Sequence, residues 1–298
     1  MYTHPIIKGQ APEKFLPKGT ALVCEGGGTR GFYSAGVFEA FMDEGIMFPY
    51  IIGVSAGAAN ALSYISGQKG RSRQIVEHYV KDKRYVSRRN LLRHGSLFGY
   101  DFIFKEIPYN HVFWDREMFN SVDTRFLTGA IDCKTGQTVW FEKDDMSYDF
   151  TETLASCSVP LVAKVVKHKG YELLDGGIAD PIPIEQSIKD GNNFHVIVLT
   201  RNQGFRLTPA SYPSLIKFVY KKYPKLVEVM LNRHEIYNRQ LELCEKLEQE
   251  GRALIIRPQI PLAVTRSTRD TAKLLALYDE GHQEGKEVIE RIAHGLHG

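Results

Sequence analysis

The sequence lacks several features that would place it in a specialised class of protein. None of its 298 residues belongs to an apolar run long enough to cross a bilayer. The opening stretch, MYTHPIIKGQAPEKFLPKG, has neither the apolar core nor the cleavage pattern of a secretory signal. The net charge of +3 gives no reason to expect nucleic acid binding. We therefore expect a cytoplasmic protein.

Cysteine is also scarce. The four cysteines are widely separated and form no CxxC pair, which excludes a zinc ribbon or a disulfide framework. We expect them to be reduced thiols: Cys24, Cys133, Cys157 and Cys244.

What the sequence does contain is the alternation of an α/β protein. A strand at 20–24, a tight glycine turn and a helix at 32–44 are followed by a second strand, turn and helix at 51–65. The continuous apolar run at 194–199 is typical of a strand buried on both faces of a mostly parallel sheet. Further predicted elements are hairpins at 125–142 and 164–174, helices at 215–249 broken at Pro224, a strand at 253–256, and a last helix capped by Ser267.

No repeat or low-complexity linker divides the chain. We expect an N-terminal arm (1–18), a main α/β domain (19–200) and a mainly helical C-terminal part (201–298) packed on the same domain.

The glycine-rich turn after the first strand has two interpretations. Gly26, Gly28 and Gly31 satisfy the GxGxxG pattern of dinucleotide-binding proteins, between a strand and a helix. A dinucleotide site also needs an acidic residue at the end of the second strand. Asp43 and Glu44 instead lie at the end of the intervening helix. A nucleotide-dependent oxidoreductase is therefore the less favoured alternative.

The second interpretation is an oxyanion hole. Successive glycines allow backbone N–H groups to converge ahead of a helix N-terminus, where negative charge is stabilised. Arg30 adds a cation that either holds a phosphate head group or stiffens the loop.

A candidate nucleophile follows the second strand. Ser55 is the centre of GVSAG, a GxSxG pattern in which the serine lies on a strained turn between strand and helix, flanked by Gly53 and by Ala56 and Gly57. A structural turn is the alternative interpretation, and the preceding strand and glycine loop favour the nucleophile.

No histidine is well placed to activate this serine. His195 lies within an apolar strand, and His234 and His282 lie on charged helical stretches. His294 and His297 belong to the C-terminal tail. A catalytic triad therefore looks absent.

The best remaining base is Asp175, which precedes Gly176 and Gly177 at the end of a predicted strand. A carboxylate at such a turn can act as a base when it lies within hydrogen-bonding reach of the proton. In the alternative interpretation, the aspartate only stabilises its own turn.

Taken together, four motifs resemble those of patatin-like phospholipases, particularly the bacterial cytosolic members. They are GGGTRG at 26–31, GVSAG around Ser55, ASCSVP at 155–160 and DGG at 175–177, in family order. The resemblance implies a three-layer α/β/α fold and a Ser55–Asp175 dyad that cleaves acyl esters of lipids through an acyl-serine, with no metal or cofactor. It also implies that the amides of Gly27 and Gly28 form the oxyanion hole. A catalytically silent acyl-lipid-binding protein of the same fold is the main alternative.

A basic stretch at 69–93 leads into aromatic and apolar residues up to Phe104. A solvated helix face next to a core segment is the favoured interpretation, and peripheral contact with an anionic membrane at the inner face is the alternative. The bases are Lys69, Arg71, Arg73, Lys81, Lys83, Arg84, Arg88, Arg89 and Arg93.

Overall fold

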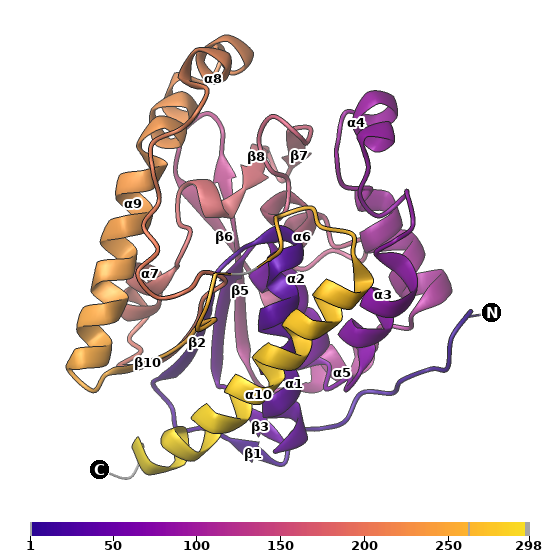
Figure 1. The fold of residues 1–298 in the computed structure, drawn as a ribbon, viewed down its shortest axis with the longest axis vertical. Helices are drawn as coiled ribbons and strands as arrows, with labels where there is room; N and C mark the ends of the chain where they lie inside the picture. The colour runs from indigo at the N-terminus through magenta and orange to yellow at the C-terminus, as the bar shows by residue number, and fades with distance from the viewer. Residues whose placement is uncertain (1, 262, 296–298) are drawn as a thin grey trace.

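An eight-stranded β-sheet forms the centre of the protein (Figure 1). The structure is a computed structural model that describes residues 2–261 and 263–295. The strand order is β10-β9-β2-β4-β5-β8-β7. Strands β4 and β8 pair with one edge of β5, and β6 pairs with its opposite edge. The strands are β2 (Thr20–Cys24), β4 (Tyr50–Val54), β5 (Arg125–Asp132), β6 (Thr138–Glu142), β7 (Val166–His168), β8 (Tyr171–Asp175), β9 (Phe194–Val198) and β10 (Ala253–Ile256).

The sheet is mostly parallel. From β10 through β9, β2 and β4 to β5, every neighbouring pair is parallel, whereas β6, β7 and β8 pair in antiparallel fashion. A separate two-stranded sheet joins β1 (Lys14–Phe15) to β3 (Ile46–Met47).

Helices cover both faces of this sheet (Figure 1). Side chains alternate between the faces of a strand, so Leu22 and Cys24 pack against one helical layer, and Ala21 and Val23 against the other. Burial on both faces explains the continuous apolar runs and confirms the predicted α/β fold. The α-helices are α1 (Phe32–Asp43), α2 (Ala56–Ile65), α3 (Arg71–Tyr79), α4 (Arg88–His94), α5 (Arg116–Ser121), α6 (Thr151–Ser156), α7 (Ile184–Lys189), α8 (Pro213–Val219), α9 (Pro224–Gln249) and α10 (Thr271–Gly295). The other helical segments are the π-helix η2 (Phe102–His111) and the short 3-10 turns η1 (Gly28–Gly31), η3 (Lys143–Asp145) and η4 (Gly176–Ile178).

The C-terminal part is built into the same body. Strand β10 extends the sheet beside β9, and α9 packs over the face that includes Ala21 and Val23. Helix α10 lies directly against α1, where Gly36 and Gly281 allow close approach. A Cβ on Gly36 would lie 1.9 Å from the Tyr278 carbonyl oxygen. The boundaries predicted at residues 18 and 200 remain predictions.

Two local predictions need correction. The last helix begins at Thr271, and its cap is Asp270, whose Oδ1 accepts a hydrogen bond from the Lys273 N–H at 3.3 Å. Ser267 lies in the preceding loop instead. The first strand of the 164–174 hairpin is shifted toward the turn and occupies Val166–His168.

Within the described residues, no helix has the length and apolar character that a membrane span requires.

Candidate active site

The sheet register brings two distant segments together. Strand β4 runs along one edge of β5 and ends with Val54 paired to Gly129. Strand β8 runs in the opposite direction along the same edge and ends with Asp175 paired to Ala130. Because Gly129 and Ala130 are neighbours, the ends of β4 and β8 meet, and the residue after β4 is Ser55.

Ser55 has an unusual backbone conformation. Its φ of 54° and ψ of −130° lie in a region that a side chain with a Cβ rarely adopts, at a cost of about 1–3 kcal/mol. The conformation is held by the Ser55 N–H, which donates to the Ser156 Oγ at 2.8 Å. Gly57 allows the helix to start directly behind the serine, since a Cβ there would lie 2.6 Å from the Cys24 carbonyl oxygen. These features correspond to the strained turn predicted from GVSAG.

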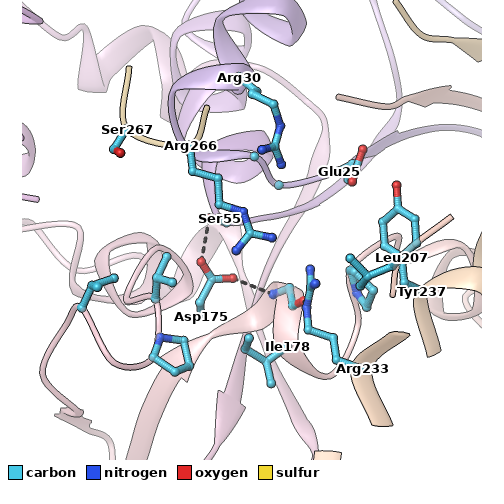
Figure 2. A pocket seen from close by; sticks show the side chains of 18 of the residues that line it. Glu25, Arg30, Ser55, Asp175, Ile178, Leu207, Arg233, Tyr237, Arg266 and Ser267 are labelled. Carbon is cyan, nitrogen blue, oxygen red and sulfur yellow. Dashed lines mark hydrogen bonds between the residues drawn. The ribbon is translucent and has the colours of Figure 1, made fainter. Parts of the chain in front are cut away.

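The Ser55 and Asp175 side chains are hydrogen-bonded to each other (Figure 2). The Ser55 Oγ donates to the Asp175 Oδ2 at 2.8 Å, and the other carboxylate oxygen accepts from the Gly177 N–H at 2.8 Å. Each residue is only 6% exposed. Burial raises the pKa of Asp175, and the bonds from Ser55 and Gly177 oppose that rise because they favour the ionised form.

The turn that presents Asp175 is tightly constrained. A Cβ on Gly176 would lie 2.1 Å from the Gly129 carbonyl oxygen, so only glycine fits there. The Arg233 Nε of α9 donates to the Gly177 carbonyl at 2.6 Å. Helix α9 therefore braces the turn from the C-terminal part of the chain.

The glycine loop lies against the serine. A Cβ on Gly26 would be 2.8 Å from the Ser55 Cβ. Within the described residues, the backbone N–H groups of Gly26, Gly27 and Gly28 donate no hydrogen bond. The loop is anchored on its far side, where the Thr29 N–H donates to the Arg266 carbonyl at 2.9 Å. These amides are therefore available to a ligand, as the oxyanion-hole prediction requires.

The remaining motif residues support this arrangement. Gly31 approaches the start of α2, where its Cβ would lie 2.6 Å from the Ala56 Cβ. A Cβ on Gly53 would lie 2.9 Å from the Ala58 nitrogen. Arg30 is 4% exposed, and its Nε is buried without a hydrogen-bond partner among the described residues. Burial lowers the pKa of Arg30 to about 10.

The described histidines with hydrogen-bonding contacts interact with residues other than Ser55 and Asp175. His195 is fully buried in β9 as predicted, its Nδ1 is 3.2 Å from the Ser187 Oγ, and burial lowers its pKa to about 4. The His282 Nε2 lies 2.7 Å from an Asp43 carboxylate oxygen, and the His234 Nδ1 lies 3.2 Å from the Leu231 carbonyl. No histidine among the described residues lines a cavity at Ser55. His294 lies near the end of α10, and His297 lies outside the described residues.

Two cavities meet at Ser55. One, of about 330 Å³, contains the dyad, the glycine loop and four arginines. The other, of about 80 Å³, is lined mainly by apolar and aromatic side chains, including Phe32, Ile103 and Phe104. Three of the arginines were not among the predicted site residues: Arg201, Arg233 and Arg266. They lie outside every motif, and no sequence signal marked them.

The basic stretch at 69–93 does not form one surface. Arg71 is 7% exposed, and its guanidinium donates to the Ser63 Oγ and to backbone carbonyls, so it is a structural residue. Arg73 and Arg84 form ion pairs with acidic neighbours. The exposed bases Arg88, Arg89 and Arg93 lie on α4, beside Leu92, which is 87% exposed.

Comparisons with known proteins match two parts of the chain to family models. The family model described as patatin-like phospholipase matches residues 22–188, and a model of a domain of unknown function, DUF6363, matches residues 223–297. The uncharacterized protein YjjU of Escherichia coli K12 is 26% identical over 83% of this chain and 71% of its own length.

Lysophospholipases NTE1 of Debaryomyces hansenii and Yarrowia lipolytica are each 24% identical, over 91% and 96% of this chain. The aligned regions are only 18% and 20% of those longer proteins. Among solved structures, VipD from Legionella pneumophila aligns with a TM-score of 0.45 at 13% identity, over 95% of this chain and 68% of that one.

Proposed function

Since the chain belongs to the patatin-like phospholipase family, we propose that it is a serine hydrolase that cleaves acyl esters of lipids through the Ser55–Asp175 pair. The observation that carries this proposal is the 2.8 Å hydrogen bond from the Ser55 Oγ to the Asp175 Oδ2, at the junction of β4 and β8. The match to the patatin-like phospholipase family and the similarity to lysophospholipases both favour a lipid ester as substrate.

In the proposed reaction, Asp175 accepts the proton of Ser55 as the serine oxygen attacks the ester carbonyl carbon. The tetrahedral intermediate collapses with departure of the alcohol, which takes the proton back from Asp175. Water then attacks the acyl-serine with Asp175 again as the base, and the fatty acid leaves as Ser55 is restored. The raised pKa of Asp175 suits a base, because a carboxylate that is less stable when ionised accepts a proton more readily.

The free amides of the glycine loop complete the proposed machinery. Negative charge develops on the carbonyl oxygen during attack, and the unpaired N–H groups of Gly27 and Gly28 follow Gly26, which packs against Ser55. Loss of one such donor in a comparable site slows the reaction roughly 100-fold to 1,000-fold. We therefore assign the loop nearly the same importance as the base.

Labelling with a fluorophosphonate tests this proposal. We expect covalent modification of Ser55, complete loss of labelling in Ser55→Ala, and strongly slowed labelling in Asp175→Asn. The matched controls are Ser121→Ala and Asp123→Asn, at exposed positions away from the site, and both should label like the wild type. Binding of a fatty acyl ester without labelling or turnover would instead support the catalytically silent binding protein. A rise in melting temperature with NAD would support the dinucleotide alternative.

We also propose peripheral contact with anionic membrane through α4. Helices α4 and α8 both project at the top of Figure 1, and each carries exposed apolar groups next to basic ones. Leu92 precedes Arg93 and lies three residues after Arg89 on the helix, and Phe218, which is 75% exposed, follows Lys217. Flotation with anionic vesicles should recover the protein at low salt, and no salt-sensitive binding would remove this proposal.

A further inference from the structure

The larger cavity at Ser55 has an unusual charge balance. Its lining includes four arginines and two acidic residues, Glu25 and Asp175, which leaves an excess of two positive charges. The four arginines come from separate parts of the chain: Arg30 from η1, Arg201 from the loop after β9, Arg233 from α9 and Arg266 from the loop before α10.

The two acidic residues offset only part of this positive charge, and they do so without direct pairing. In the part of the chain that the structure describes, none of the four forms an ion pair with a carboxylate. Glu25 is engaged elsewhere, because one of its carboxylate oxygens accepts hydrogen bonds from the Thr200 N–H at 2.6 Å and the Thr200 Oγ1 at 3.2 Å. The cavity therefore holds cationic groups whose natural counter-charge is a ligand.

The most deeply buried of these groups is Arg30. Its buried Nε has no partner among the described residues, and a buried charged group without a partner is costly. Figure 2 shows Arg30, Arg233 and Arg266 around the space beside the dyad. Burial lowers the pKa of Arg30 and of Arg233 to about 10, so both remain charged at neutral pH.

The position of Ser55 relates this cation cluster to the substrate. Ser55 lines both cavities, so it lies between the arginines and the mainly apolar cavity of Phe32, Ile103 and Phe104. An ester whose carbonyl reaches Ser55 can direct the first part of its acyl chain into the apolar cavity and its alcohol portion toward the arginines.

We propose that the arginine cavity binds the phosphate of the substrate's alcohol portion and that acylglycerol phosphate monoesters are the preferred substrates. This inference rests on the proposed hydrolase function. Arginine suits this role because its planar fork of N–H donors matches phosphate oxygens. A phosphate monoester carries a charge between about −1.5 and −2 at neutral pH, which balances the excess in the cavity. Two of the four arginines, Arg233 and Arg266, lie within the C-terminal region matched by DUF6363, which gives that region a role in substrate choice.

The test compares three monomeric esters with the same acyl chain: monooleoylglycerol phosphate, its phosphocholine ester and monooleoylglycerol. We expect the wild type to favour the phosphate over the neutral ester in kcat/KM by about tenfold or more. Arg201→Gln and Arg266→Gln should each reduce that preference by about tenfold, acting mainly through KM. These positions are suitable because Arg201 is partly exposed, Arg266 is exposed, and neither side chain donates a hydrogen bond among the described residues. Arg239→Gln, an exposed position on α9, is the matched control and should retain the preference.

A binding experiment separates this inference from the proposed function. In Ser55→Ala protein, which cannot form the acyl-serine, monooleoylglycerol phosphate and glycerol phosphate should raise the melting temperature, and Arg201→Gln should abolish the shift. Ser55-dependent hydrolysis with equal rates for phosphate and neutral esters would overturn the inference and leave the hydrolase proposal intact. An equal shift with inorganic phosphate and no preference among the esters would assign the cavity to free phosphate, which would also overturn it. If the wild-type protein hydrolyses none of the esters but still binds monooleoylglycerol phosphate in an arginine-dependent way, the hydrolase proposal is refuted and only the anion site is supported.

Discussion

Gly26→Ala tests whether the backbone of the glycine loop sets the position of Ser55. The new Cβ would lie 2.8 Å from the Ser55 Cβ, 3.2 Å from the Val54 carbonyl oxygen and 3.5 Å from the Ser55 Oγ. Non-bonded carbons normally approach to about 3.5–4.0 Å, so the two residues must separate by about 0.7–1.2 Å. Catalytic groups tolerate only about 0.5 Å of displacement.

A misplacement of this size costs about 100-fold in rate, which corresponds to about 2.7 kcal/mol of transition-state stabilisation. The overpacking itself costs about 1–3 kcal/mol of folding stability, or a melting temperature lower by several degrees. We therefore expect Gly26→Ala to be folded and almost inactive.

The assay is kcat/KM for p-nitrophenyl butyrate, measured beside the melting temperature. Gly191→Ala is the matched control, because Gly191 has a φ of +91° with open space around its Cβ position. It should lose a comparable amount of stability through backbone strain and keep its activity. A folded Gly26→Ala protein with wild-type kcat/KM would refute the argument, since the loop could then move without displacing Ser55.

Three further predictions concern residues around the dyad. Ser156→Ala removes the acceptor of the Ser55 N–H and should lower the free energy of unfolding by about 1–3 kcal/mol, together with kcat, in urea titration and ester assays. In wild type, kcat/KM should fall as the pH drops through the raised pKa of Asp175, because the protonated carboxyl cannot accept the Ser55 proton; a profile with its midpoint at the ordinary aspartate pKa or below would argue against it. Burial raises the pKa of Asp180 from 3.8 to about 7, so the ionised form is disfavoured and stability is lost as the pH rises through that value. Asp180→Asn should therefore stabilise the protein by about 1–3 kcal/mol near pH 8 and have little effect near pH 4, and equal effects at both would contradict this reasoning.

Local sequence patterns were sufficient to predict the strands of the central sheet, but they did not predict β1, β3 or the short helices α5, α6 and α7. Strands β5, β6 and β10 occupy the predicted residues, because alternating or continuous apolar runs bounded by turn residues leave little choice of conformation. The last helix was harder to delimit. Ser267 and Asp270 are both suitable caps, and the hydrogen bond to the Lys273 N–H in the folded chain selects Asp270.

The sequence by itself determined which residue types and turns the site contains. GVSAG specifies a serine on a strained turn, and DGG specifies a carboxylate followed by glycines, since these turns need residues without a Cβ. Tertiary structure alone decided that the two meet, because β4 and β8 end at adjacent residues of β5. The tertiary structure also brings Arg201, Arg233 and Arg266 together around one cavity. No motif predicts this cluster, because each arginine comes from a different segment of the chain and only packing brings their charges together.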